Sequence, residues 1–371
     1  MKRPYITCEN YYIESVWWLL HNLYSQGLIY KGYTIQPYSP AAGTGLSSHE
    51  LNMPGCYRDV KDTTVTAMCR MTSPQGAFKT DWGETYFMAW TTTPWTLPSN
   101  TALCVGPKID YVLVNTFNPY TAQPISVVMA EARIASYFNP AGAEAAMENY
   151  EKGGKILPYR VVAHFKGTDL EGLKYEQLFA YVNPGEGAFR VILGDYVSTE
   201  DGTGIVHIAP TFGADDAFVA KKAGVPALQL IDKNGNKRPM VDLKGRFYKL
   251  EDLDEDFKQK HMNVDLYKTY AGRFVKNAYD DKLTDKDETL DISICMELKA
   301  SGLAFRIEKH VHNYPHCWRT DKPILYYPLD SWFIRSTARK ERMFELNKNI
   351  KWKPQSTGTG RFGKWLENLN D

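Results

Sequence analysis

Three adjacent threonines stand between a tryptophan and a proline in the string Trp90-Thr91-Thr92-Thr93-Pro94-Trp95-Thr96-Leu97-Pro98-Ser99-Asn100. An apolar run, Tyr86 to Ala89, precedes the string and predicts a strand. Threonine is unfavourable in helices, and proline pushes the residue before it into an extended conformation. We therefore expect a rigid non-helical edge whose hydroxyl groups bind a polar ligand. A plain strand that runs into a proline-rich turn would have the same composition.

A second segment carries a histidine and two acids at close spacing. The residues 205–208 read as a short apolar strand that contains His207, and Pro210 ends it. Asp215 and Asp216 then open a helix that we expect to end at Gly224. Taken alone, the two acids could merely complement the helix dipole, and the histidine could be a satisfied core residue.

Together the two segments resemble the editing domain of class I isoleucyl-tRNA synthetases. The threonine string resembles the threonine-rich peptide of that domain, where valyl and leucyl relatives carry Thr-Thr-Arg-Pro. The segment from Gly202 to Phe218 resembles the other wall of the same pocket. The resemblance extends over nearly the whole chain, and its flanking parts are the segments 31–33, 43–50, 314–319 and 331–334. These flanks resemble the stem that joins the editing domain to the catalytic body.

The pattern of short strands predicts an α+β fold. Apolar runs at 65–69, 86–89, 111–114, 125–129, 160–165, 189–193 and 205–208 predict strands, and Asn234-Gly235 predicts a hairpin turn. Helices are expected at about 11–26, 131–150, 214–223 and 287–300. Many short strands with few helices indicate a β-barrel-like domain at 56–300, between mixed α/β stem segments at 1–55 and 301–371.

The resemblance implies proofreading. A hydrophobic pocket cannot strongly exclude an amino acid that is one methylene smaller, so the family hydrolyses valine from tRNA(Ile) at a second site. Asp216 would pair with the α-ammonium of the aminoacyl group, and His207 would form the wall that excludes isoleucine. The hydroxyl groups of Thr92 and Thr93 would bind the ribose, the ester or the attacking water. The expected positioning and substrate-contacting residues are Trp90, Thr91 and Asn100.

Neither ATP-handling signature of the family, a His-Ile-Gly-His type motif or a Lys-Met-Ser-Lys-Ser type loop, occurs in the chain. We therefore expect a fragment that keeps the editing domain, needs no cofactor and leaves ATP and magnesium to the parent synthetase. Cys317 retains one thiolate of the Cys-x-x-Cys pairs that hold a stem zinc in some relatives, which is too few ligands for a tetrahedral site. No metal is expected.

Composition constrains the partners. The net charge is +1 from 44 basic and 43 acidic residues, so tRNA contact must be local. Six scattered cysteines and the lack of an apolar run near the ~20 residues of a membrane span favour a cytoplasmic protein, and we expect a monomer. Two alternatives stay open: a noncatalytic module that binds the tRNA 3′ end, and a valyl-type editing domain that clears threonine. The first would not need the carboxylate of Asp216, and Thr93 in place of arginine argues against the second.

Overall fold

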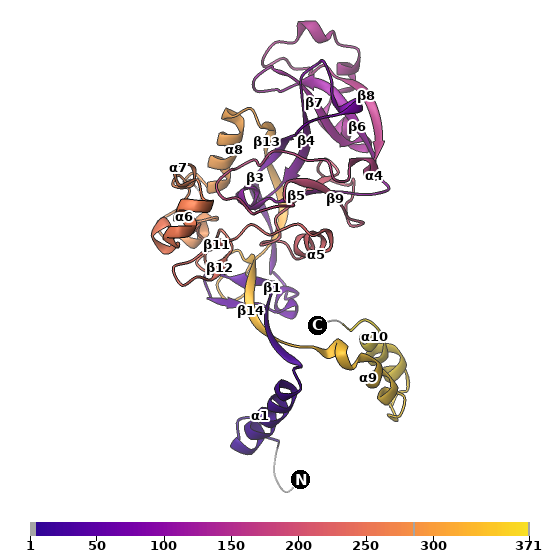
Figure 1. The fold of residues 1–371 in the computed structure, drawn as a ribbon, viewed down its shortest axis with the longest axis vertical. Helices are drawn as coiled ribbons and strands as arrows, with labels where there is room; N and C mark the ends of the chain where they lie inside the picture. The colour runs from indigo at the N-terminus through magenta and orange to yellow at the C-terminus, as the bar shows by residue number, and fades with distance from the viewer. Residues whose placement is uncertain (1–4, 285, 370–371) are drawn as a thin grey trace. The chain divides into compact units, whose positions relative to one another are not determined.

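The computed structural model describes residues 5–284 and 286–369, which divide into two compact units (Figure 1). The larger unit is continuous, Ile35–Pro328, and the smaller unit combines the segments Met1–Thr34 and Leu329–Asp371. Every residue that the sequence marks for the site belongs to the larger unit.

A six-stranded mixed sheet forms the centre of the larger unit. Its strand order is β13-β3-β4-β7-β6-β8, with β4 and β7 parallel and the other neighbours antiparallel. Both faces of the sheet are covered, because neighbouring residues of β6 such as Val112 and Leu113 are both buried and belong to two different apolar clusters. The strands are β13 (Ala304–Pro315), β3 (Tyr57–Arg70), β4 (Glu84–Thr91), β7 (Pro124–Ala130), β6 (Asp110–Phe117) and β8 (Arg160–Lys166).

A second sheet has three short strands in the order β10-β5-β9, which are Ile205–Ile208, Ala102–Val105 and Arg190–Leu193. The loop before β10 ties this sheet to β4, because the Thr203 hydroxyl donates to the carbonyl oxygen of Met88 at 2.6 Å. Gly204 in this loop has φ +75°, and a Cβ there would lie 2.4 Å from that of Ala130. The close approach of loop and sheet therefore requires glycine, and it brings the ends of β4 and β10 together.

The expected barrel-like shape is wrong. Within the described residues, the edge strands β13 and β8 of the large sheet do not pair with each other, and the β10-β5-β9 sheet is separate. Closure needs a continuous ladder from the first strand to the last. The sequence predicted the individual strands but could not show how their edges pair, because edge pairing depends on contacts distant in sequence. The α+β content is confirmed.

The predicted strands and most of the predicted helices are present. Two helices agree closely with expectation, α5 (Ala214–Ala223) and α8 (Leu290–Ala300), and Gly224 ends α5 with φ +68°. The single helix expected at 131–150 is wrong, because Pro140 interrupts it and Gly142 packs against the carbonyl oxygen of Leu157. Only short turns occur there, of which α3 (Ile134–Tyr137) is the one α-helical turn.

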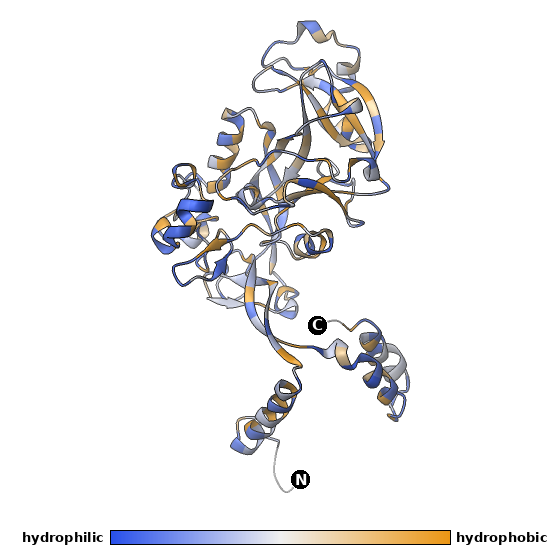
Figure 2. Cartoon of the chain, viewed as in Figure 1, coloured by the Kyte–Doolittle hydropathy of each residue, from blue (hydrophilic) through white to orange (hydrophobic). Residues whose placement is uncertain are grey.

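The remaining elements of the larger unit are short. The hairpin predicted at Asn234-Gly235 joins β11 and β12, and Gly235 has φ +78°. In Figure 2 the helix α6 is coloured hydrophilic, in keeping with its interleaved acids and bases, whereas hydrophobic colour follows the strands of the large sheet. The bounds are β2 (Thr44–Gly45), α2 (Ser48–Leu51), α4 (Gly167–Leu170), β11 (Leu230–Ile231), β12 (Lys237–Arg238), α6 (Glu255–His261) and α7 (Val264–Tyr267).

The smaller unit contains α1 (Asn10–Ser25), α9 (Lys340–Asn347) and α10 (Phe362–Glu367). Two strands, β1 (Ile29–Ser39) and β14 (Leu325–Ile334), continue from one unit into the other. The helix α1 has the predicted position, but none of its residues is buried, and Trp17 is 68% exposed. No helix among residues 5–284 and 286–369 is long and apolar enough to cross a lipid bilayer.

Candidate editing pocket

The threonine string leaves the large sheet at the end of β4 and turns at once into a 3-10 helix, Pro94–Ser99. Proline at the first helical position suits this turn, since its fixed φ is preorganised and its missing N–H needs no partner. The backbone N–H of Thr93 donates to the Thr91 hydroxyl at 3.1 Å, and the Thr93 hydroxyl lies 3.3 Å from that of Thr91. The side chains of Thr91 and Thr93 are therefore engaged with each other.

His207 of β10 is held from both ring nitrogens. Its Nε2 lies 3.0 Å from the hydroxyl oxygen of Thr96, and its Nδ1 lies 3.5 Å from the amide nitrogen of Asn100. Thr96 donates its single hydroxyl hydrogen to the carbonyl oxygen of Thr93, at 2.8 Å. With that hydrogen on the Thr93 carbonyl, the contact at Nε2 assigns the imidazole proton to Nε2 and leaves Nδ1 as a weak acceptor.

Two further facts support that proton assignment. Tyr175 donates to the Oδ1 of Asn100 at 2.6 Å, so the amide nitrogen of Asn100 is the atom on the side of the imidazole, where it donates chiefly to the carbonyl oxygen of Ala102 at 2.8 Å. Burial lowers the pKa of His207 to about 4, so the ring is neutral at pH 7. A neutral imidazole with both nitrogens engaged serves better as a fixed wall than as a general base.

A cavity of about 300 Å³ lies where β4 meets the loop before β10. Trp90, Thr91, Thr92 and His207 line it together with residues of the Gly202 to Val206 segment. The Thr92 hydroxyl has no hydrogen-bond partner anywhere in the described part of the chain, whereas that of Thr93 is engaged. Thr92 is thus the free hydroxyl group of the threonine string at this cavity.

Gly202 shapes the same cavity. Its φ is +65°, and a Cβ at this position would lie 3.2 Å from the indole ring of Trp90. The indole also stands edge-on to the ring of His310 on β13, with 5.3 Å between ring centroids. The indole is therefore fixed on two sides, and it forms a rigid part of the cavity wall.

Thr93, Asn100 and Asp216 are not among the residues that line the cavity. Thr93 contacts the lining residue Thr91, and Asn100 contacts the lining residue His207. The Oδ2 of Asp216 accepts from the backbone N–H of Ala209 at 2.9 Å, directly after β10. Its carboxylate lies against Gly213, where a Cβ would come within 2.6 Å of the carboxyl carbon. Glycine at this position lets the carboxylate fold back over the loop.

The surroundings of Asp216 raise the pKa of its carboxyl group and so favour the neutral form. Burial and the neighbouring Asp215 raise its pKa to about 6, and the hydrogen bond from Ala209 opposes them. Ionised Asp216 lacks a cation in the described structure, because none of the ion pairs of the described residues includes it. A cationic ligand group would supply the missing partner.

Three residues that line the cavity, Ser198, Asp201 and Tyr196, were not predicted from the sequence. Tyr196 has the largest side chain of the three. It lines the cavity beside His207 and also a second cavity of about 450 Å³ that Asp215 and Phe218 line. The residue is 41% exposed, yet desolvation of its hydroxyl group and the neighbours Cys104 and Asp216 raise its pKa well above the usual value. No pattern in Gly194-Asp195-Tyr196 marks the tyrosine, since the loop has no periodicity.

Four of the residues that the sequence marks, Trp90, Thr91, Thr92 and His207, line one cavity. The model of the family described as "tRNA synthetases class I (I, L, M and V)" matches residues 1–371. The chain belongs to this family. In the described residues, no group of three or more His, Cys, Asp or Glu side chains could hold a metal ion.

Two relatives within the family are isoleucine–tRNA ligases. The chain is 72% identical over 371 residues to the isoleucine–tRNA ligase of Bacteroides fragilis, a match that covers 100% of this chain and 32% of that protein. It is 65% identical over 372 residues to the isoleucine–tRNA ligase of Porphyromonas gingivalis, covering 100% and 33%. The resemblance to isoleucyl-tRNA synthetases is confirmed, and the chain spans about a third of the length of these relatives.

Solved structures of editing domains also match. The cytosolic leucyl-tRNA synthetase editing domain of P. falciparum matches with a TM-score of 0.38 and 11% identity, over 67% of this chain and 100% of that chain. That of P. knowlesi matches with a TM-score of 0.38 and 12% identity, over 67% and 97%.

Proposed function

We propose that this chain proofreads tRNA(Ile) by hydrolysing the ester bond between valine and the terminal adenosine of the tRNA. One observation carries the proposal: residues of the threonine string and His207 line the same cavity. Thr96 of the string contacts His207 directly, although the two residues are 111 positions apart in the sequence. The editing domain would comprise residues 56–300, with stem segments at 1–55 and 301–371. The expected partner is the valine-charged 3′ end of tRNA(Ile), bound by a monomer in the cytoplasm.

The reaction needs a water molecule to attack the carbonyl carbon of the ester. The bond from that carbon to the ribose oxygen then breaks, and the ribose oxygen takes a proton, which releases valine and uncharged tRNA. The free hydroxyl of Thr92 would orient the water or the ester, and Thr91 and Thr93 would hold the Thr92 backbone in place. Orientation of a water beside fixed hydrogen-bonding groups can supply much of a hydrolytic rate.

Recognition would use the two ends of the amino acid. The carboxylate of Asp216 would pair with the α-ammonium group of the amino acid. This group would be the cationic partner that the carboxylate lacks in the described structure. The imidazole of His207, neutral and braced by Thr96, would exclude the extra methylene of isoleucine by contact. Size exclusion of this kind requires a wall that cannot move, and the hydrogen bond between Nε2 and the Thr96 hydroxyl would supply that rigidity.

The test is deacylation of Val-tRNA, Ile-tRNA and Thr-tRNA by the purified chain. Hydrolysis of Val-tRNA(Ile) with little effect on Ile-tRNA(Ile) is expected. Preferential hydrolysis of Thr-tRNA would instead support the valyl-type alternative. Binding of tRNA without hydrolysis of any of the three would support the noncatalytic module.

A further inference from the structure

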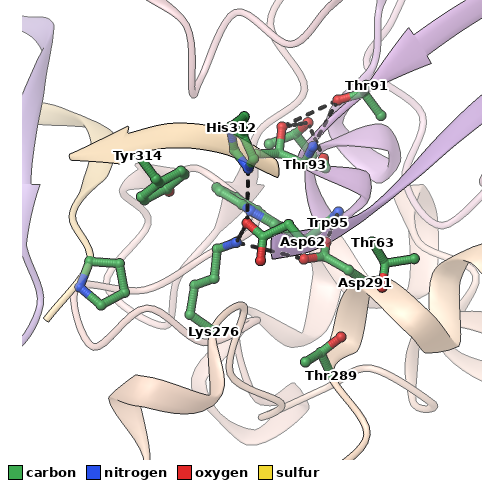
Figure 3. A network of polar contacts seen from close by, with 12 residues as sticks. Asp62, Thr63, Thr91, Thr93, Trp95, Lys276, Thr289, Asp291, His312 and Tyr314 are labelled. Atoms are coloured by element: carbon green, nitrogen blue, oxygen red, sulfur yellow. Dashed lines mark hydrogen bonds and ion pairs between the residues drawn. The ribbon is translucent and has the colours of Figure 1, made fainter. Parts of the chain in front are cut away.

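A cluster of ionisable side chains lies next to the threonine string, on β3, β13, α8 and the segment that carries Lys276 (Figure 3). Lys276 Nζ lies 2.7 Å from an oxygen of Asp62 and 3.8 Å from an oxygen of Asp291. His312 Nε2 lies 3.2 Å from the same Asp62 oxygen. We call these four residues the charge cluster. A cluster of this kind costs desolvation free energy, which its ion pairs and hydrogen bonds offset.

Asp291 connects the charge cluster to the threonine string. Its side chain is only 4% exposed, and its Oδ1 accepts from the backbone N–H of Trp95 at 2.9 Å. Its Oδ2 faces Lys276. Asp291 stands in the first turn of α8, a helix that Thr289 caps by accepting from the N–H of Ile292. One carboxylate therefore ties the string to a helix and to a buried cation.

The hydrogen bond from Trp95 to Asp291 lies in the first turn of the 3-10 helix Pro94–Ser99. Trp95 lies directly between Pro94 and Thr96, and Thr96 braces both Thr93 and His207. A shift of the Trp95 backbone would therefore displace the hydroxyl groups of the string relative to the imidazole. A misplacement of about 1 Å can cost a catalyst about 10²-fold.

We propose that Asp291 is a positioning residue that holds the threonine string in its reactive position through the backbone N–H of Trp95. The kinetic part of this inference rests on the proposed editing function. The structural part does not, because it concerns a hydrogen bond within the chain.

The electrostatics of the charge cluster allow Asp291 to be replaced without leaving Lys276 unpaired. Hydrogen bonding from His312 and the charge of Lys276 outweigh burial and lower the pKa of Asp62 to about 2, so Asp62 stays ionised beside Lys276. Burial raises the pKa of Asp291 to about 6, opposed by Lys276, the Trp95 N–H and Lys309. After replacement of Asp291, Lys276 and Asp62 still form an ion pair.

The test compares two replacements of the same shape. Asp291→Asn keeps an oxygen that can accept from Trp95, whereas Asp291→Leu fills the same space without an acceptor. Thr289→Ala is the matched control, because it weakens the same end of α8 without touching Trp95. Each variant is measured for kcat and KM on Val-tRNA(Ile) and for hydrogen exchange of the Trp95 amide. Labelling tryptophan with ¹⁵N marks nine backbone amides, and Trp95→Phe identifies the signal of Trp95.

Asp291→Leu should lower kcat at least tenfold with KM within about threefold of the parent, and should speed exchange of the Trp95 amide at least tenfold. Asp291→Asn and Thr289→Ala should stay within about threefold of the parent in both measurements. An unchanged kcat or an unchanged Trp95 exchange rate in folded Asp291→Leu overturns the proposal, as does a defect of equal size in Asp291→Asn. If the parent chain does not hydrolyse Val-tRNA, the proposed function fails and the amide exchange alone decides the role of Asp291.

Discussion

The hydroxyl oxygen of Thr96 lies 3.0 Å from Nε2 of His207, and this contact joins the threonine string to the opposite wall of the pocket. The hydroxyl hydrogen of Thr96 goes to the carbonyl oxygen of Thr93, so the ring N–H of His207 depends on Thr96 for its acceptor. A residue outside the catalytic set thereby fixes both the tautomer and the orientation of the proposed wall.

Thr96→Val should remove this acceptor while it keeps the side-chain shape. The Nε2–H of His207 would lose its partner in a partly buried site, which costs about 1–3 kcal/mol in the free energy of unfolding. We also expect discrimination between Val-tRNA and Ile-tRNA to fall, because the imidazole can then turn. Urea unfolding and paired deacylation assays measure the two effects. Unchanged stability together with unchanged discrimination would contradict the bracing role of Thr96.

His207→Ala should let the pocket hydrolyse correctly charged Ile-tRNA, because removal of the blocking atoms ends size exclusion. His207→Gln is the control, since glutamine retains both bulk and an N–H donor and should keep most of the discrimination. The ratio of kcat/KM for Ile-tRNA to that for Val-tRNA is the readout, with a folding check because the alanine variant leaves a cavity. A proportional loss of both activities would assign His207 a structural or catalytic role instead.

The local elements could be read from the sequence, and their pairing could not. The strands at β4 and β10 and the helix α5 follow from apolar runs and from stop signals at Pro210 and Gly224. The arrangement of those strands in two open sheets depends on the pairing of β10 with β5 and of β4 with β3 and β7, and on the bond from Thr203 to Met88 that ties the sheets together, none of which a local pattern encodes. The barrel-like shape was wrong for this reason.

In the site, too, the residues marked by local sequence patterns were predicted, whereas contacts between residues distant in sequence were not. The resemblance brought the threonine string and His207 to one pocket, and the structure places Trp90, Thr91, Thr92 and His207 around one cavity. Thr96 lies in the string, but its contact with His207 could not be predicted, and Tyr175 and Asp291 carried no signal, because each of these three contacts joins residues distant in sequence. Tyr196 was missed since it lies in an irregular loop.

Asp216→Asn and Asp216→Ala separate two possible roles of Asp216. Asparagine can still accept from the N–H of Ala209, so it removes the charge and leaves the loop in place, whereas alanine removes both. Both variants should raise KM for Val-tRNA by about 10- to 150-fold, as expected for a lost charged hydrogen bond of about 1.5–3 kcal/mol. Parental activity in folded Asp216→Asn would mean that the carboxylate only shapes the loop and does not bind the ammonium group.

Thr92→Val should lower kcat about tenfold or more, because it removes the one free hydroxyl of the threonine string at the cavity without a change of volume. Loss of a single hydrogen bond of about 1.5 kcal/mol accounts for a factor of this size. Thr93→Val is the comparison, and it should act chiefly through stability because the Thr93 hydroxyl is engaged with Thr91 and Thr96. A normal kcat in Thr92→Val would remove the hydroxyl of Thr92 from the mechanism.

The pH dependence of kcat/KM for Val-tRNA should show a lower limb near pH 6. The pKa of Asp216 is raised to about 6, so the carboxylate becomes neutral as the pH falls through that value and can no longer pair with the ammonium group. His207, with its pKa lowered to about 4, stays neutral through this range and adds no limb between pH 5 and 9. An upper limb is expected near or below about pH 8, where the α-amino group of the substrate loses its proton.

Asp216→Asn supplies the control for this profile. With no titrating group at the anchor, the variant should have low activity and a flat profile from pH 5 to 7, after subtraction of the spontaneous hydrolysis measured without protein. A limb near pH 6 that persists in Asp216→Asn would assign the titration to another group and would contradict the ammonium-anchor role. A parental profile that stays flat down to pH 5 would show that ionisation of Asp216 does not govern binding of the aminoacyl group.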